Sequence, residues 1–280
     1  MIAMPNIREA RADSVPENKT VRAIAGNPAL TAAVETLPDY PRFRDLLAEA
    51  KKRRVTALKA RQDAEDANDS FYKSLTVASE LPQSLAAAYS NFQTALENAV
   101  SELRLVSALA NHAASSIESL VSIHVDDLFA ALNSELDALT KTVLRHAENI
   151  PAPYDAEAAL STREAQEAYC AIRDLLPTFR QIRAAQETLV RDHTYMHPEP
   201  YQVGTPGLHT LALVRNGISA QVHTINAPAA LVTHAQQGAW VPTTEELEQV
   251  WTTENRLKIA EATKVKTVDL MTYAREYRYA

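Results

Sequence analysis

Glycine is scarce in this chain. The 280 residues include only five glycines, and none of them falls between residues 27 and 203. Tight turns and close backbone approaches to a ligand depend on glycine, so its scarcity disfavours an enzyme site built from loops. Aromatic residues make up only 6% of the chain. A composition with few helix breakers and much alanine, leucine, glutamate and arginine predicts long helices.

The chain has only one cysteine, and it lacks long apolar runs and a segment that resembles a signal peptide. A single cysteine, Cys170, excludes an intramolecular disulfide framework. Cys170 sits on an apolar helical stripe, which favours a packed core residue over a nucleophile. No run approaches the roughly 18 apolar residues of a transmembrane helix, and the N-terminus does not resemble a signal peptide. We therefore expect a protein that is cytoplasmic or incorporated in an assembled particle, with no membrane partner.

The net charge of −7 argues against nucleic acid as the main partner. The charge is uneven along the chain. Residues 41–80 carry nine Lys or Arg against seven Asp or Glu, and residues 82–150 carry three against eight. Opposite net charge favours these two segments as neighbours. The densest basic cluster, residues 51–54, lacks interleaved aromatics and is predicted to be a solvated face.

The first 80 residues predict an arm and a long helix. Residues 1–40 contain four prolines among small and polar residues, which predicts an extended N-terminal arm with a short helix at 29–36. A helix at about 41–80 follows, since Pro41 suits a first helical turn. Steps of four and three alternate along its apolar stripe, which has three polar members in the middle. The stripe consists of Phe43, Leu47, Ala50, Arg54, Ala57, Arg61, Ala64, Asn68, Phe71, Leu75 and Ala78.

A second long helix is predicted at about 83–150, because Pro82 interrupts the first and neither Gly nor Pro follows until residue 151. Its stripe alternates strictly for five heptads. The members are Tyr89, Phe92, Leu96, Ala99, Leu103, Val106, Ala110, Ala113, Ile117, Leu120 and His124. After His124 three successive steps of four follow, which predicts a rotation of the seam at 124–132. His124 itself is predicted to be a core histidine with a hydrogen-bond partner, or a buried polar residue that sets the register between helices.

A third helix is predicted at 162–193. Ser161 and Glu164 have the spacing of a capping box. The apolar stripe keeps its phase across Pro177, so we expect one continuous, kinked helix.

Residues 197–280 differ in character and predict a smaller α+β region. Two β-capable runs flank an Asn-Gly pair at 216–217, the strongest short signal for a β-hairpin, here at 208–225. Thr243 and the glutamate three residues later form a second capping box, which predicts a helix at 243–264.

The C-terminal tail is rich in tyrosine and arginine, the residues enriched at interface hot spots. Its candidate partner-binding residues are Tyr273, Arg275, Tyr277, Arg278 and Tyr279. The sequence does not distinguish between docking of this tail onto a protein partner and docking onto the chain's own bundle.

The histidines are the candidate metal ligands. His193 and His197 are four residues apart, so one helical face could present both, with Asp192 or Glu199 completing a site. The intervening residues do not match a zinc-protease motif, and Pro198 should end the helix there. Ordinary surface or hydrogen-bonded histidines are therefore favoured, and we predict no cofactor, no bound metal and no catalytic residue.

Together these patterns predict a mainly α protein: an elongated antiparallel helical bundle or coiled coil with one small β-hairpin and a C-terminal helix. The predicted segments are the arm (1–40), the long-helix bundle (41–196) and the α+β region (197–280). We expect a non-enzymatic structural or interaction protein that binds protein partners or itself. A virion accessory or minor structural protein, a scaffold and a secretion-machine part all fit. The alternatives are a helical-bundle metalloenzyme using the His193–His234 region and a membrane-active helical bundle.

Overall fold

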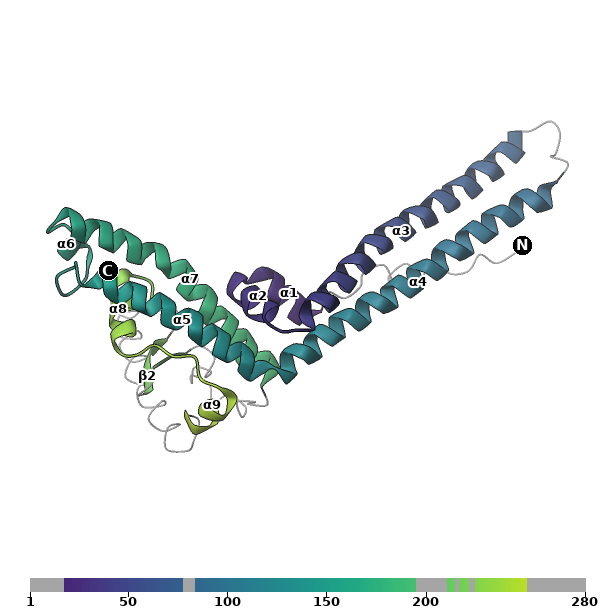
Figure 1. The fold of residues 1–280 in the computed structure, drawn as a ribbon. Coiled ribbons are helices and arrows are strands. Elements are labelled where there is room, and N and C mark those ends of the chain that lie inside the picture. Colours follow the sequence, from purple (N-terminus) through teal and green to yellow (C-terminus); the bar gives the residue numbers. More distant parts are fainter. Residues whose placement is uncertain (1–17, 78–83, 195–210, 215–216, 222–224, 251–280) are drawn as a thin grey trace, which may run out of the picture. The chain divides into compact units, whose positions relative to one another are not determined.

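The computed structural model describes residues 18–77, 84–194, 211–214, 217–221 and 225–250, and this part of the chain is mainly helical (Figure 1). The helices are α1 Lys19–Gly26, α2 Pro28–Glu35, α3 Tyr40–Val77, α4 Leu85–Ile123, α5 Val125–Ala147, α6 Ala156–Ala159, α7 Arg163–His193, α8 Pro228–Gln236 and α9 Thr244–Val250. The mainly α class is therefore confirmed. The described chain divides into two compact units, with Leu37–Leu120 in unit 1 and Ala23–Thr36 and the elements from Val121 onward in unit 2.

Unit 1 is built around a hairpin of two long helices. Figure 1 shows α3 and α4 running side by side in opposite directions. The rings of Phe71 on α3 and Phe92 on α4 lie 5.3 Å apart between centroids. Every described member of the predicted α3 stripe is buried or partly buried, and on α4 only Tyr89 of the stripe up to Leu120 is exposed. The predicted stripe is thus the less exposed face of each helix.

The predicted helix at 83–150 is interrupted at His124. This residue has φ −104° and ψ 25°, outside the helical region, and α5 begins at the next residue. His124 is partly exposed, and its Nδ1 lies 2.8 Å from a carboxylate oxygen of Asp127. The predictions of a continuous helix and of a buried register-setting His124 are therefore wrong. The break occurs where the step of the stripe changes. Every apolar member of the stripe beyond it is buried in unit 2.

Unit 2 has its core between α5 and α7, which α2 and α8 also contact. The α5 stripe continues the pattern read from the sequence, with Leu128, Leu132 and Leu136 fully buried. The predicted α7 stripe is buried at nearly every position, including Ile172, Phe179, Ile182 and Leu189. Burying these large aliphatic and aromatic side chains stabilises unit 2 by roughly 1.5–3 kcal/mol each relative to exposure.

Helix α7 runs without interruption through Pro177, as the stripe predicts. The predicted capping box at Ser161 is wrong by one residue. Oγ1 of Thr162 accepts the backbone N–H of Ala165 at 3.0 Å and caps the helix. Ser161 instead donates to the carbonyl of Ala158 at 2.7 Å, because the short helix α6 ends there. The other capping box is confirmed: the backbone N–H of Thr243 donates to Glu246 at 2.8 Å before α9.

The extended arm predicted for residues 1–40 is wrong where the structure describes it. Residues 19–26 form α1, and α2 matches the short helix expected at 29–36. Asn27 between them caps α2, because its Oδ1 accepts the backbone N–H groups of Ala29 and Leu30 at 3.0 and 3.2 Å. Its Nδ2 donates to the carbonyl of Gln181 on α7 at 2.9 Å. One side chain thus both starts α2 and fixes it to the core.

Replacing Asn27 by alanine is expected to lower the free energy of unfolding by about 1–2 kcal/mol, because α2 loses its cap and the Gln181 carbonyl loses a donor. Asn27→Asp keeps the capping oxygen but cannot donate to that carbonyl. Its free energy of unfolding should therefore lie between those of the wild type and Asn27→Ala. Urea unfolding followed by tryptophan fluorescence measures this, since Trp240 belongs to unit 2. Equal stability of wild type and Asn27→Ala would show that the cap contributes nothing.

Strands β1 Leu211–Val214 and β2 Gly217–Gln221 pair antiparallel, with Leu211 opposite Gln221 and Val214 opposite Gly217. The register shifts once, between Ala212 and Leu213. The two residues between the strands lie outside the described part, as do the predicted boundary near 196 and the end of the helix predicted to run to 264.

Candidate functional site

His193, the first candidate metal ligand, lies at the end of α7 and is only 8% exposed. Its Nδ1 is 2.9 Å from Oγ of Ser122. The second candidate, His197, lies outside the described residues. His193 therefore contacts a hydroxyl group of the same unit, as a hydrogen-bonded core histidine does.

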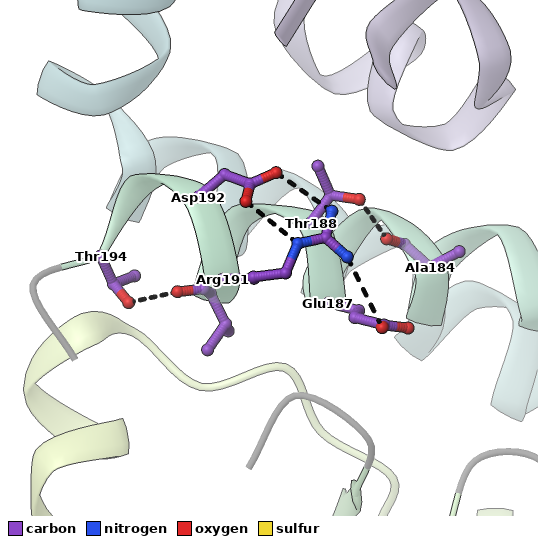
Figure 2. A network of polar contacts seen from close by, with 7 residues as sticks. Ala184, Glu187, Thr188, Arg191, Asp192 and Thr194 are labelled. Atoms are coloured by element: carbon purple, nitrogen blue, oxygen red, sulfur yellow. Dashed lines mark hydrogen bonds and ion pairs between the residues drawn. The ribbon is translucent and has the colours of Figure 1, made fainter. Parts of the chain in front are cut away.

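Asp192, which could complete a metal site with His193, is held by the adjacent Arg191. Nε and Nη2 of Arg191 each donate to a carboxylate oxygen of Asp192 at 3.0 Å, and Nη1 lies 3.8 Å from Glu187 (Figure 2). The hydrogen bond to Asp192 is the first cause of the raised pKa of Arg191. Within the described ranges no group of three or more His, Cys, Asp or Glu side chains is placed to hold a metal ion.

A buried polar cluster joins α7, α8 and the segment after α8. We call it the Arg183 cluster; it consists of Arg183, Gln186, His234 and the carbonyl of Trp240. Nη1 of Arg183 donates to Oε1 of Gln186 at 2.7 Å and to the Trp240 carbonyl at 2.9 Å. Nη2 of Arg183 lies 2.8 Å from Nε2 of His234. Arg183 and His234 are each 1% exposed, so water does not reach these contacts freely.

Phe179 supports both charged and aromatic members of the cluster. Its ring centroid lies 5.5 Å from the guanidinium carbon of Arg183, within the range of a cation–π contact. The ring of His234 meets it edge to face at 5.5 Å and 72°.

Burial sets the protonation of the cluster. Burial first, and the neighbouring charge of Arg183 second, lower the pKa of His234 to about 3. His234 is thus neutral at neutral pH and accepts from Arg183 through Nε2, which places its own hydrogen on Nδ1. Burial lowers the pKa of Arg183 to about 9, so the guanidinium stays protonated at neutral pH. The result is one cation held by neutral acceptors.

This arrangement positions α8 and the residues after it on α7. Next to the cluster, the backbone N–H of Val241 donates to Oδ1 of Asn133 on α5 at 2.9 Å. The sequence indicates the cluster only indirectly: Gln186 is a polar member of a buried stripe, and Arg183 lies three residues before it. Nothing in the sequence places His234 beside them, because that contact joins residues 51 positions apart.

The α3–α4 hairpin carries exposed apolar side chains outside its seam. The side chains of Val55, Leu105 and Leu109 are 69%, 59% and 38% exposed. Tyr72, and Tyr89 of the predicted stripe, are also exposed, toward the end of the hairpin where α3 ends and α4 begins. Val55 lies on α3, whereas Leu105 and Leu109 lie four residues apart on α4. Exposed large apolar side chains are candidates for contact with another protein.

A hollow of about 150 Å³ lies between α3 and α4 among these tyrosines. Its lining residues include two acidic ones, Glu65 and Asp69, and three aromatic ones, Tyr72, Tyr89 and Phe92. Glu65 also pairs with Arg61 at 2.9 Å, a partly buried i,i+4 contact on the surface of α3. An acidic and aromatic hollow suits a cationic side chain.

Of the remaining predicted residues, some are described by the structure and others lie outside the described ranges. Lys51, Lys52 and Arg53 are exposed, as predicted for a solvated basic face, but Arg54, the fourth residue of that cluster, is partly buried, so the prediction is wrong there. Cys170 is partly buried on α7. The tail residues Tyr273 to Tyr279 lie outside the described part, so their partner-binding role stays a prediction.

Comparison with protein-family models, with curated proteins and with solved structures finds no match for this chain. None of the described helices combines the length and the apolar character needed to cross a membrane.

Proposed function

We propose that this chain is a non-enzymatic structural or interaction protein whose α3–α4 hairpin is an antiparallel coiled coil that binds protein in a larger assembly. A virion accessory or minor structural protein, a scaffold and a secretion-machine part belong to this class. The observation that carries the proposal is the set of exposed apolar side chains outside the hairpin seam, above all Val55, Leu105 and Leu109.

The composition of the seam supports the same proposal. Three of the four buried members of the seam on α3 are the alanines at 50, 57 and 64, which bury little apolar area per turn; the fourth is Leu47. Arg54, Arg61 and Asn68 occupy the positions between and after them. The Nε and Nη2 atoms of Arg54 are buried and have no hydrogen-bond partner among the residues described. A two-helix seam with these residues gains stability when further helices cover it.

The metalloenzyme and membrane-active alternatives have no comparable observation among the described residues. The two described histidines of the first alternative contact Ser122 and Arg183.

The test compares the full chain with a variant carrying Val55→Ser, Leu105→Ser and Leu109→Ser. Each is purified under mild conditions from cells that contain its natural partners. The wild type should be recovered in stoichiometric association with protein, either other chains or further copies, and the triple variant should lose that association. Circular dichroism serves as the control, because these exposed positions should leave the helix content unchanged. A wild-type chain recovered as a partner-free monomer would contradict the proposal.

A further inference from the structure

Four residues of α3 repeat at intervals of seven along one flank of the seam. Lys51, Leu58, Glu65 and Tyr72 each follow a seam residue directly, so they share one helical face. Glu65 and Tyr72 both line the hollow described above, which confirms that this flank faces the gap between α3 and α4 on one side of the hairpin. Lys51 is exposed and Leu58 is partly exposed. We call these four residues the flank stripe.

The flank stripe is self-complementary about Leu58. Lys51 lies seven residues before Leu58, and Glu65 lies seven residues after it. When two copies of α3 run antiparallel with Leu58 opposite Leu58, the lysine of each copy lies opposite the glutamate of the other. The same relation places Arg44 opposite Tyr72, an arrangement compatible with a cation–π contact.

The charge of the whole hairpin changes sign from one end to the other, in the same direction as along the flank stripe. Residues 40–61 carry eight Lys or Arg and two Asp or Glu, whereas residues 62–77 carry one and four. On α4, residues 85–103 carry two Glu and no Lys or Arg, and residues 104–120 carry one Arg and one Glu. Segments 85–103 and 62–77 lie at the same end, as the contact between Phe71 and Phe92 shows. One end of the hairpin is therefore net positive and the other net negative.

We propose that a second copy of this chain docks antiparallel on the flank stripe, in a twofold dimer with Leu58 at the axis and Lys51 of each copy against Glu65 of the other. This deepens the proposed function, on which it rests, by naming the partner and the surface. A twofold interface uses the same patch on both copies, so each contact occurs twice. A parallel pairing would bring the positive ends together, and like charges at that spacing repel.

The acidic hollow gives the basic residues of the second copy a place to bind. Glu65 and Asp69 supply carboxylates, and Tyr72, Tyr89 and Phe92 supply ring faces and apolar walls. Nε of Arg61 binds Oε1 of Glu65, and because carboxylates accept several hydrogen bonds, the glutamate can also accept from a lysine.

Charge exchange tests the pairing. Sedimentation velocity of the full chain should detect a reversible dimer at low salt. Lys51→Glu and Glu65→Lys should each raise the dimer Kd by about tenfold or more, because each substitution places like charges together twice per dimer. The double variant Lys51→Glu/Glu65→Lys should restore the dimer, since it exchanges the two charges and keeps the pairing.

The matched control is Asp63→Lys. This substitution makes the same change of charge as Glu65→Lys. Asp63 lies two residues from Glu65 but on the opposite side of α3, and it is exposed. It should leave the dimer Kd within about threefold of the wild type. A wild type that stays monomeric, equal effects at 63 and 65, or a double variant as weak as both singles would overturn the proposal.

The axis has its own test. In a Cys170→Ser background, Leu58→Cys should be joined to a second copy by a short bis-maleimide reagent, because the two thiols meet at the axis. Ala60→Cys is exposed on the far side of α3 and should give little joined product. Circular dichroism checks that both variants keep their helices. Equal yields at 58 and 60 would overturn the antiparallel arrangement.

These results separate the two proposals. A chain that is monomeric alone but binds other proteins through Val55, Leu105 and Leu109 overturns the dimer and keeps the proposed function. A chain that is monomeric and partner-free overturns both.

Discussion

Replacing Arg183 by alanine is expected to lower the free energy of unfolding by about 3–5 kcal/mol, the largest loss at a single polar position in the described chain. The substitution leaves Nε2 of His234, Oε1 of Gln186 and the Trp240 carbonyl buried without the donor they share. Each unsatisfied buried acceptor costs about 1–3 kcal/mol, and the lost side-chain volume adds a cavity. Removal of the buried charge offsets part of this cost.

Urea unfolding followed by tryptophan fluorescence measures the loss in unit 2. Arg180→Ala is the matched control, because Arg180 lies on the same helix and is exposed. Its effect should stay within about 0.5 kcal/mol. Arg183→Lys should lower the free energy of unfolding by an amount that approaches the loss in Arg183→Ala, since an ammonium group cannot reach three acceptors as the planar guanidinium does. If Arg183→Ala costs no more than Arg180→Ala, the cluster does not fix α8.

Acidification is expected to destabilise unit 2 through His234. The pKa of this imidazole is about 3 in the folded chain and about 6.5 when unfolded, so the folded state binds fewer protons between those values. The stabilisation is fully present above pH 6.5 and is lost as the pH falls toward 3. The slope is about 1.4 kcal/mol per pH unit, which makes a loss of about 2–3 kcal/mol between pH 6.5 and 4.5.

The His234→Gln variant isolates this effect from the carboxylates that also titrate. Its amide oxygen can accept from Arg183 but does not bind a proton in this range. The free energy of unfolding is measured in urea at several pH values for both chains, and the difference between them should shrink steadily on acidification. His112→Gln, at an exposed position of α4, should keep the wild-type slope. Parallel curves for wild type and His234→Gln would contradict a neutral buried imidazole.

The long helices could be predicted from the sequence because their signal is local and repeated. Each turn of α3, α4, α5 and α7 contributes an apolar residue at the expected step, so single exceptions such as Arg54 do not obscure the period. Pro177 is tolerated for the same reason, since the stripe continues beyond it.

The errors arose where one backbone position or one distant contact decides the structure. The slip in the stripe after His124 fits both a continuous, locally unwound helix and a break, and the spacing alone does not separate them. Ser161 and Thr162 both suit an N-cap, and the unforeseen α6 decides between them. The α1 segment has too few residues for a clear period.

The candidate sites show the same division. The flank stripe and the polarity of the hairpin are visible in the sequence once α3 is known to be one helix, since both depend only on spacing. The Arg183 cluster is not visible, because it joins side chains from α7, α8 and the Trp240 backbone that only folding brings together.

The molar mass of the full chain in solution tests the central claim most directly. Light scattering over a dilution series, at low and at high salt, should show a species of twice the chain mass that dissociates on dilution. That dissociation should occur at higher protein concentration when salt screens the paired charges. A single chain mass at every concentration and salt, with no other protein bound, would contradict the account of the α3–α4 hairpin as a binding surface.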